Sequence, residues 1–100
     1  MIWTAGALAN LLQMRDFLWD KSPAAAMRAM GAIHEGLKQL EEFPQLGRPV
    51  ANRDRDERDW LIHFGRGGYK VRYRNDDGQI IILALRHMRE NEFRPSDDPA

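Results

Sequence analysis

The second half of the chain contains three short segments with strand-like patterning, joined by two turn sequences, and this arrangement limits the fold more than any other feature. In residues 60–64 the large apolar side chains of Trp60, Ile62 and Phe64 alternate with Leu61 and His63, and residues 69–74 alternate apolar and cationic side chains, as half-buried strands do. Residues 79–85 are almost entirely apolar, which favours a central strand covered on both faces. Gly65-Arg66-Gly67-Gly68 and Asn75-Asp76-Asp77-Gly78 supply turn residues between these segments. The sequence therefore predicts a three-stranded antiparallel meander.

The first half of the chain starts with a β-favouring segment, Ile2-Trp3-Thr4, and continues with apolar residues at helical spacing. Residues 5–20 are predicted to form an amphipathic helix with Thr4 as its N-cap. The apolar side of this helix is predicted to consist of Leu8, Leu11, Leu12, the aliphatic stem of Arg15, Leu18 and Trp19.

A second helix is predicted from Pro23 to about Phe43. Ser22 is suited to cap it, and proline is tolerated at the first position of a helix. Gly31 and Gly36 each cost a helix about 1 kcal/mol relative to alanine, which indicates close packing against the first helix. Since the connection is short, the two helices should form an antiparallel hairpin. The apolar stripe of the second helix is predicted to contain Ala26, Met30, Ile33, Leu37 and Leu40.

The predicted element order is β-α-α-β-β-β, an α+β fold in which the helical hairpin packs on a small antiparallel sheet and the first strand joins an edge. The prolines of residues 43–49 stop the second helix. The polar residues 51–59 are predicted to be an exposed connection. We expect one domain, residues 1–100, in which residues 95–100 are a flexible tail.

Composition excludes several classes of protein. The chain has no cysteine, which excludes disulfides and thiolate metal sites. No segment approaches the roughly 18 apolar residues of a membrane span, so we expect a cytoplasmic protein that does not meet the membrane. Fifteen basic and fifteen acidic side chains give a formal net charge of zero. The overall charge therefore does not attract nucleic acid.

The candidate site is a group of basic side chains on two neighbouring strands and the segment after them. One strand carries cations at alternate positions, and the end of the next strand returns beside its start. Because these cations repel one another, we expect an acidic partner segment that folds on binding to cover them; a solvated, salt-bridged surface is the alternative. The predicted site consists of Lys70, Arg72, Arg74, Arg86, His87 and Arg89.

The three histidines are too far apart in sequence for a metal-binding motif, so we predict no metal and no cofactor. His34 is predicted to lie on the surface, and His63 in a packing or rim position. His87 is the candidate catalytic histidine because basic residues flank it.

Cleavage of RNA requires a general base, positive charge at the phosphate and an acid for the leaving oxygen. His87 would serve as base or acid, and Arg86 or Arg89 would bind the phosphate. A third group is missing, because Tyr69 and Tyr73 are predicted to face the core. The nuclease interpretation is therefore incomplete.

Several short motifs follow one another across residues 2–90. Each motif alone is a weak indication of a protein family, but their order along the chain is specific. They are Ile2-Trp3-Thr4, Ser22-Pro23 with the alanines after it, the helix end with Leu40, Pro44, Gly47, Arg48 and Pro49, the strands 69–73 and 80–83, and Arg86-His87 with Arg89. In this order the segments resemble the RelE/ParE toxins of type II toxin–antitoxin systems.

This resemblance implies a toxin that is neutralised by a co-expressed antitoxin, with which it would form a hetero-oligomer. RelE-like members cut messenger RNA in the ribosome, whereas ParE-like members poison DNA gyrase. Phe93 stands where a RelE-like sequence is expected to have a catalytic tyrosine. The Gly47-Arg48-Pro49 loop and the Arg86-His87-x-Arg89 ending are similar to ParE-type sequences.

The resemblance therefore favours gyrase inhibition. A ribosome-dependent endoribonuclease, or a non-toxic relative that acts as an interaction module, is the alternative. For Arg48 two interpretations stay open: a functional residue, or one that only shapes its loop.

Overall fold

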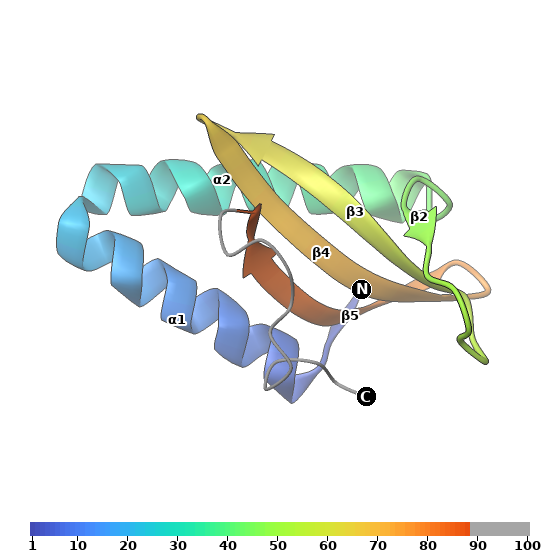
Figure 1. The fold of residues 1–100 in the computed structure, drawn as a ribbon. Coiled ribbons are helices and arrows are strands. Elements are labelled where there is room, and N and C mark those ends of the chain that lie inside the picture. The colour runs from blue at the N-terminus through green and yellow to red at the C-terminus, as the bar shows by residue number, and fades with distance from the viewer. Residues whose placement is uncertain (89–100) are drawn as a thin grey trace.

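The computed structural model describes residues 1–88, which form two helices and a five-stranded sheet (Figure 1). The strand order is β1-β5-β4-β3-β2, in which β1 is parallel to β5 and every other pair is antiparallel. The α+β fold and the β-α-α-β-β-β order are confirmed, and the first strand lies at an edge as predicted. The predicted tail lies outside the described residues. The elements are β1 (Ile2–Trp3), α1 (Ala5–Lys21), α2 (Pro23–Glu42), β2 (Arg48–Pro49), β3 (Glu57–Phe64), β4 (Gly67–Asp76) and β5 (Gln79–His87).

Both helices begin at the predicted capping residues. The Thr4 hydroxyl oxygen accepts a hydrogen bond from the Ala7 amide at 3.1 Å, and the Ser22 hydroxyl oxygen accepts one from the Ala25 amide at 3.2 Å. The Ser22 amide also donates to the Leu18 carbonyl at 2.8 Å. A single residue therefore ends α1 and begins α2, which keeps the hairpin connection short.

The helical hairpin covers one face of the sheet, with α1 against β5 and α2 against β3 (Figure 1). Tyr69, Val71 and Tyr73 alternate along β4 and are buried, as predicted. The predicted stripe of α2 is also buried, except that Met30 is only partly so. The core consists of Ala7, Ala29, Ile33, Leu37, Leu40, Ile62, Tyr69, Val71, Tyr73, Ile80, Ile82 and Leu85.

The predicted apolar side of α1 is wrong in part. Its apolar residues span an arc wider than the single side on which α1 meets the rest of the chain, so only part of that arc is buried. The side chains that pack against the core are Ala7, Leu11, Met14 and Leu18. The side chains that stay exposed are Leu8, Leu12, Phe17 and Trp19.

The prediction that Gly31 and Gly36 allow close packing of α2 against α1 is wrong. A Cβ atom at Gly36 would lie 2.7 Å from Cδ1 of Ile62, so this glycine makes room for β3. A Cβ atom at Gly31 would have no neighbour within 4 Å. The two glycines therefore differ in role.

Alanine substitutions should separate these roles. We expect Gly31→Ala to raise the free energy of unfolding by about 0.5–1 kcal/mol, because alanine favours the helix and meets nothing. Gly36→Ala should lower it by about 1 kcal/mol, because crowding against Ile62 outweighs the same helical gain. Urea denaturation of both variants measures this; an equal gain at the two positions would contradict the close contact with β3.

Strands β3 and β5 extend beyond their predicted limits. β3 begins at Glu57, so the end of the predicted connection 51–59 belongs to the sheet. β5 continues through Arg86 and His87, which were predicted to leave the strand. Polar side chains here mark the solvent face of a strand and not a loop. Ile81 and Leu83 are only partly buried, so β5 is not fully covered on both faces.

Candidate functional site

The sheet face away from the helices carries three of the predicted site residues side by side along β4. Alternate residues of a strand point to opposite faces, and residues paired across strands share a face. Because the aromatic positions of β4 point into the core, Lys70, Arg72 and Arg74 lie on the helix-free face, as predicted. The residues paired with them are Glu57, Asp59 and Leu61 on β3 and Ile81, Ala84 and Arg86 on β5.

Two arginines of this face form ion pairs within the chain. Arg72 donates from Nε and Nη2 to the two carboxylate oxygens of Asp59, at 2.9 and 3.0 Å. Arg74 donates from Nε to Asp76 at 3.0 Å. The repulsion expected along β4 is therefore offset by acids of the same sheet. Since the side chain of Arg72 is 11% exposed, its bidentate pair is shielded from solvent more than a typical surface ion pair.

Arg86 and His87 point to opposite faces of the sheet, since they are consecutive residues of β5. Arg86 is paired with Lys70 and lies on the helix-free face. His87 is paired with Tyr69, and the two rings meet edge to face with centroids 5.2 Å apart. The prediction that these cations share one face or rim therefore does not hold for His87. Arg89 lies outside the described residues.

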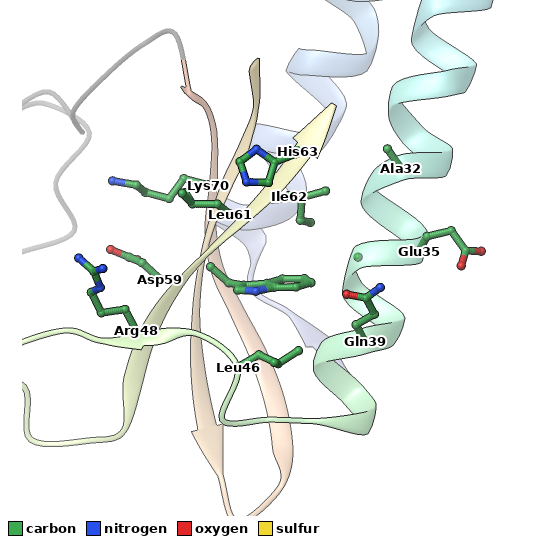
Figure 2. Close-up of a pocket in the computed structure, with 12 residues that line it drawn as sticks. Ala32, Glu35, Gln39, Leu46, Arg48, Asp59, Leu61, Ile62, His63 and Lys70 are labelled. Carbon is green, nitrogen blue, oxygen red and sulfur yellow. The ribbon is translucent and has the colours of Figure 1, made fainter. Parts of the chain in front are cut away.

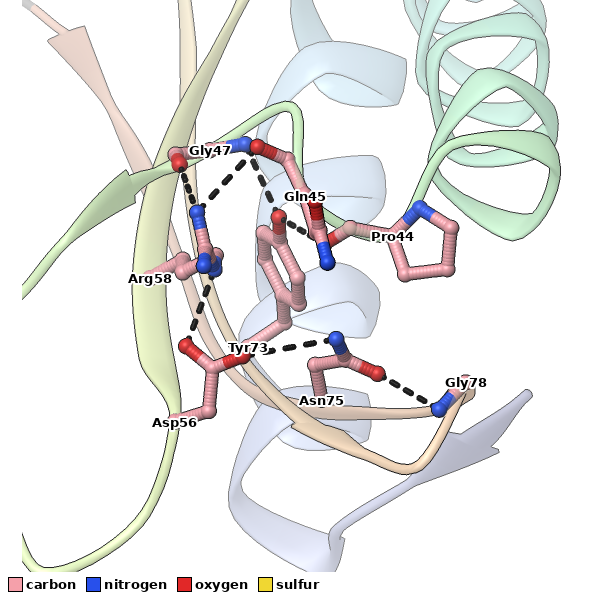
Figure 3. A network of polar contacts seen from close by, with 8 residues as sticks. All are labelled: Pro44, Gln45, Gly47, Asp56, Arg58, Tyr73, Asn75 and Gly78. Atoms are coloured by element: carbon pink, nitrogen blue, oxygen red, sulfur yellow. Dashed lines mark hydrogen bonds and ion pairs between the residues drawn. The ribbon is translucent and has the colours of Figure 1, made fainter.

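Tyr73 fixes the loop that contains Gly47-Arg48-Pro49 (Figure 3). Its hydroxyl donates to the Pro44 carbonyl at 2.7 Å and accepts from the Gly47 amide at 2.9 Å. Burial raises the pKa of the Tyr73 hydroxyl, which therefore keeps its proton. A Cβ atom at Gly47 would lie 2.7 Å from Cε1 of this ring, so the loop approaches as closely as it does only with glycine there.

Arg58 holds the same loop from the other side. Its Nη1 donates to the carbonyls of Gln45 and Gly47 at 3.1 and 3.0 Å, and its Nε donates to Asp56 at 2.9 Å (Figure 3). The loop is therefore shaped by Tyr73 and Arg58 and not by the side chain of Arg48. Arg48 is exposed on β2 and is paired in the sheet with Asp59.

A groove of about 980 Å³ lies between α2 and the edge of β3 (Figure 2). β2 pairs with β3 only at Arg58 and Asp59, and beyond these positions no strand of residues 1–88 covers this edge. Arg48, Asp59 and Lys70 lie on one side of the groove, and Glu35 of α2 lies on the other. Sequence reasoning missed this groove, because a two-residue strand that covers only part of an edge leaves no local pattern.

The other two histidines lie where the sequence analysis placed them. His34 is exposed on α2, and His63 is exposed at the rim of the groove. Among residues 1–88 the structure brings no three His, Cys, Asp or Glu side chains together as a potential metal site. Neither helix of this part of the chain combines the length and apolar character needed to cross a bilayer.

A helical hairpin packed on a small sheet is the α+β fold that the resemblance to the RelE/ParE toxins implied. The family model described as "ParE toxin of type II toxin-antitoxin system, parDE" matches residues 1–92, and the chain belongs to this family. The superfamily resemblance is confirmed, and membership implies an antitoxin partner.

Two similar proteins come from Caulobacter vibrioides. "Toxin RelE3" is 31% identical over 84 residues, which cover 84% of this chain and 88% of that protein. "Toxin RelE2" is 32% identical over 87 residues, which cover 87% of this chain and 92% of that protein. The similarity therefore extends over most of both chains.

Proposed function

We propose that this toxin inhibits DNA gyrase by binding it, and that a co-expressed antitoxin neutralises it in the cytoplasm. The match to the ParE family and the ParE-like Gly47-Arg48-Pro49 loop support this choice of target. Binding, unlike cleavage, requires a complementary surface but no set of catalytic groups.

The placement of His87 is the observation that favours binding over RNA cleavage. A proton-transfer group and a cation must reach the same phosphodiester. Arg86 lies on the helix-free face, whereas His87 lies on the opposite face beside the buried Tyr69. One phosphodiester does not contact both side chains across the thickness of the sheet. A protein partner needs only the cationic face itself.

The contact surface that we infer is the helix-free face together with Arg48 at its edge. Arg48 has no ion pair within residues 1–88, and the fixed loop holds its backbone in place. Among residues 1–88, cations outnumber acids on this face, and arginine's planar fork suits contact with carboxylates. The face therefore fits an acidic segment of the antitoxin or an acidic patch of the target. Its charged residues are Arg48, Lys70, Arg72, Arg74 and Arg86 against Glu57, Asp59 and Asp76.

A supercoiling assay with purified gyrase tests the proposal. We expect the toxin to inhibit supercoiling or to trap cleavage complexes, and Lys70→Glu to weaken this by about tenfold or more, because it reverses a charge in the middle of the inferred surface. Lys38→Glu makes the same charge change on the exposed side of α2 and should leave inhibition unchanged. Normal gyrase activity at saturating toxin would refute the proposal, and equal weakening by both variants would refute the surface.

The names of the two relatives favour a second candidate, cleavage of messenger RNA in the ribosome. Arrest of translation with site-specific cleavage, abolished by His87→Ala, would replace the gyrase proposal. Harmless expression without an antitoxin would instead indicate a non-toxic interaction module.

A further inference from the structure

The groove between α2 and the edge of β3 offers a different kind of chemical group on each of its sides (Figure 2). Glu35 and Gln39 of α2 contribute a carboxylate and an amide on one side, and Arg48 and Lys70 contribute positive charge on the other. Trp60, which is only partly buried, adds an aromatic surface to the lining. At about 980 Å³ the groove falls within the size range of sites for small molecules.

The backbone of β3 adds hydrogen-bonding groups to this groove. The Val50 amide donates to the Glu57 carbonyl at 2.8 Å, so Glu57 and every second residue after it turn their backbone N–H and C=O groups toward this edge. β2 pairs with these groups at Asp59. Leu61 and His63, which line the groove, have no strand of residues 1–88 beside them. Their amides and carbonyls therefore face the groove.

The free edge is short but long enough for one planar base. β2 limits it at one end, and the turn of residues 65–66 limits it at the other. Two residues offer few backbone groups to an added strand. An amide donor next to a carbonyl acceptor is, however, the complement of the adjacent acceptor and donor on an adenine edge. Stacking on Trp60 would cover a face of the same base.

Positive charge lies within reach of the phosphate of such a nucleotide. Arg48 is paired with Asp59, which is two residues, or about 7 Å, from Leu61 along β3. Arg48 is exposed and has no ion pair within residues 1–88, and its guanidinium suits a phosphate. The carboxylate of Asp59 does not oppose an anion, because both of its oxygens accept hydrogen bonds from Arg72. The carboxylate of Glu35 suits the ribose hydroxyls.

We propose that this groove binds an adenine nucleotide, with the backbone of Leu61 and His63 on the base, Trp60 against its face and Arg48 on the phosphate. A free nucleotide and an unpaired nucleotide of a single strand present the same groups, so either could supply this ligand. The inference goes beyond the proposed function and does not depend on the target, although Arg48 and Lys70 also belong to the inferred contact surface. Because the groove is open to solvent, the dissociation constant should be micromolar to millimolar.

Titration of the intact toxin with AMP, followed in nitrogen-15 correlation spectra, tests this inference. We expect the amide resonances of Leu61 and His63 to shift and to saturate. Arg48→Gln should weaken AMP binding by about fivefold or more, because it removes a charged phosphate contact, and should leave adenosine binding unchanged. The matched control is Lys38→Gln, which removes one charge on the exposed side of α2 outside the groove and should change neither.

A second variant closes the groove without changing its charge. Ala32 lines the groove from α2, and leucine at this position keeps a good helix former while it fills part of the space. Ala32→Leu should therefore abolish the binding of both AMP and adenosine. Far-ultraviolet circular dichroism of each variant verifies that the fold is intact.

A short single strand of deoxyadenosines distinguishes the two sources of the ligand. Tighter binding than AMP, with shifts of the same two amides, would assign the groove to an unpaired strand, and equal or weaker binding would assign it to the free nucleotide.

The absence of saturable shifts with AMP and with the single strand overturns the proposal, even if the antitoxin then protects these amides. Equal weakening by Arg48→Gln and Lys38→Gln also overturns it. Inorganic phosphate that reproduces every shift would leave an anion site only and refute the assignment of the base.

Discussion

Gly68→Ala is expected to lower the free energy of unfolding by about 3–5 kcal/mol, combining a strained backbone with a steric clash. Gly68 has φ +155°, a conformation that residues with a side chain rarely adopt. A Cβ atom there would collide with the backbone carbonyl oxygen of Ile62 and lie 3.0 Å from Cα of His63. These backbone atoms belong to β3, which is paired with β4 at this position, so they cannot move without breaking the sheet.

Urea denaturation measures this effect, and Gly78→Ala is its matched control. Gly78 also has positive φ, at +90°, but a Cβ atom there would meet nothing within 4 Å. Its substitution should cost only the backbone strain, about 1–2 kcal/mol. If the two variants lost equal stability, the contact with β3 would not be the cause. Since a domain of this size is stable by about 5–15 kcal/mol, the larger loss should be evident without denaturant as well.

The turn between β4 and β5 was predictable because local chemistry determines it. Asp77 and Gly78 both have positive φ, as a two-residue hairpin turn requires. The side-chain oxygen of Asn75 accepts a hydrogen bond from the Gly78 amide at 2.7 Å. The helix starts at Thr4 and Ser22 were predictable for the same reason. In each case the residues that determine the structure are close together in sequence.

The candidate site was harder to predict because it depends on ion pairs between residues far apart in sequence and on the residues at which the strands end. Arg86 and His87 point to opposite faces of the sheet because β5 continues past Leu85. Consecutive residues of a strand alternate between the two faces, so the residue at which the strand ends decides where these side chains lie. The ion pair that neutralises Arg72 comes from Asp59 on another strand, within a segment whose polarity resembles a loop. Neither fact has a local sequence signal.

The loop before β2 also depends on a contact between residues far apart in sequence, and removing this contact is expected to cause the second large loss of stability. Tyr73 reaches across 26 residues to the Gly47 amide, and it bonds the Pro44 carbonyl through the same hydroxyl. Tyr73→Phe keeps the ring but leaves both backbone groups without this partner. We expect a loss of about 2 kcal/mol, since an unsatisfied buried polar group costs about 1–3 kcal/mol. For a domain of this size the melting temperature should fall by roughly 8–15 °C.

Tyr69→Phe is the matched control for this prediction, because Tyr69 is equally buried on the same strand but its hydroxyl forms no hydrogen bond with another described residue. Its removal should change stability by less than about 0.5 kcal/mol. Thermal unfolding of the two variants compares the hydroxyls directly. Amide exchange at Gly47 should accelerate in Tyr73→Phe alone, since only this variant loses the acceptor of that amide. Equal melting temperatures for both variants would mean that the hydroxyl of Tyr73 does not hold the loop, and that the position of Arg48 depends on Arg58 instead.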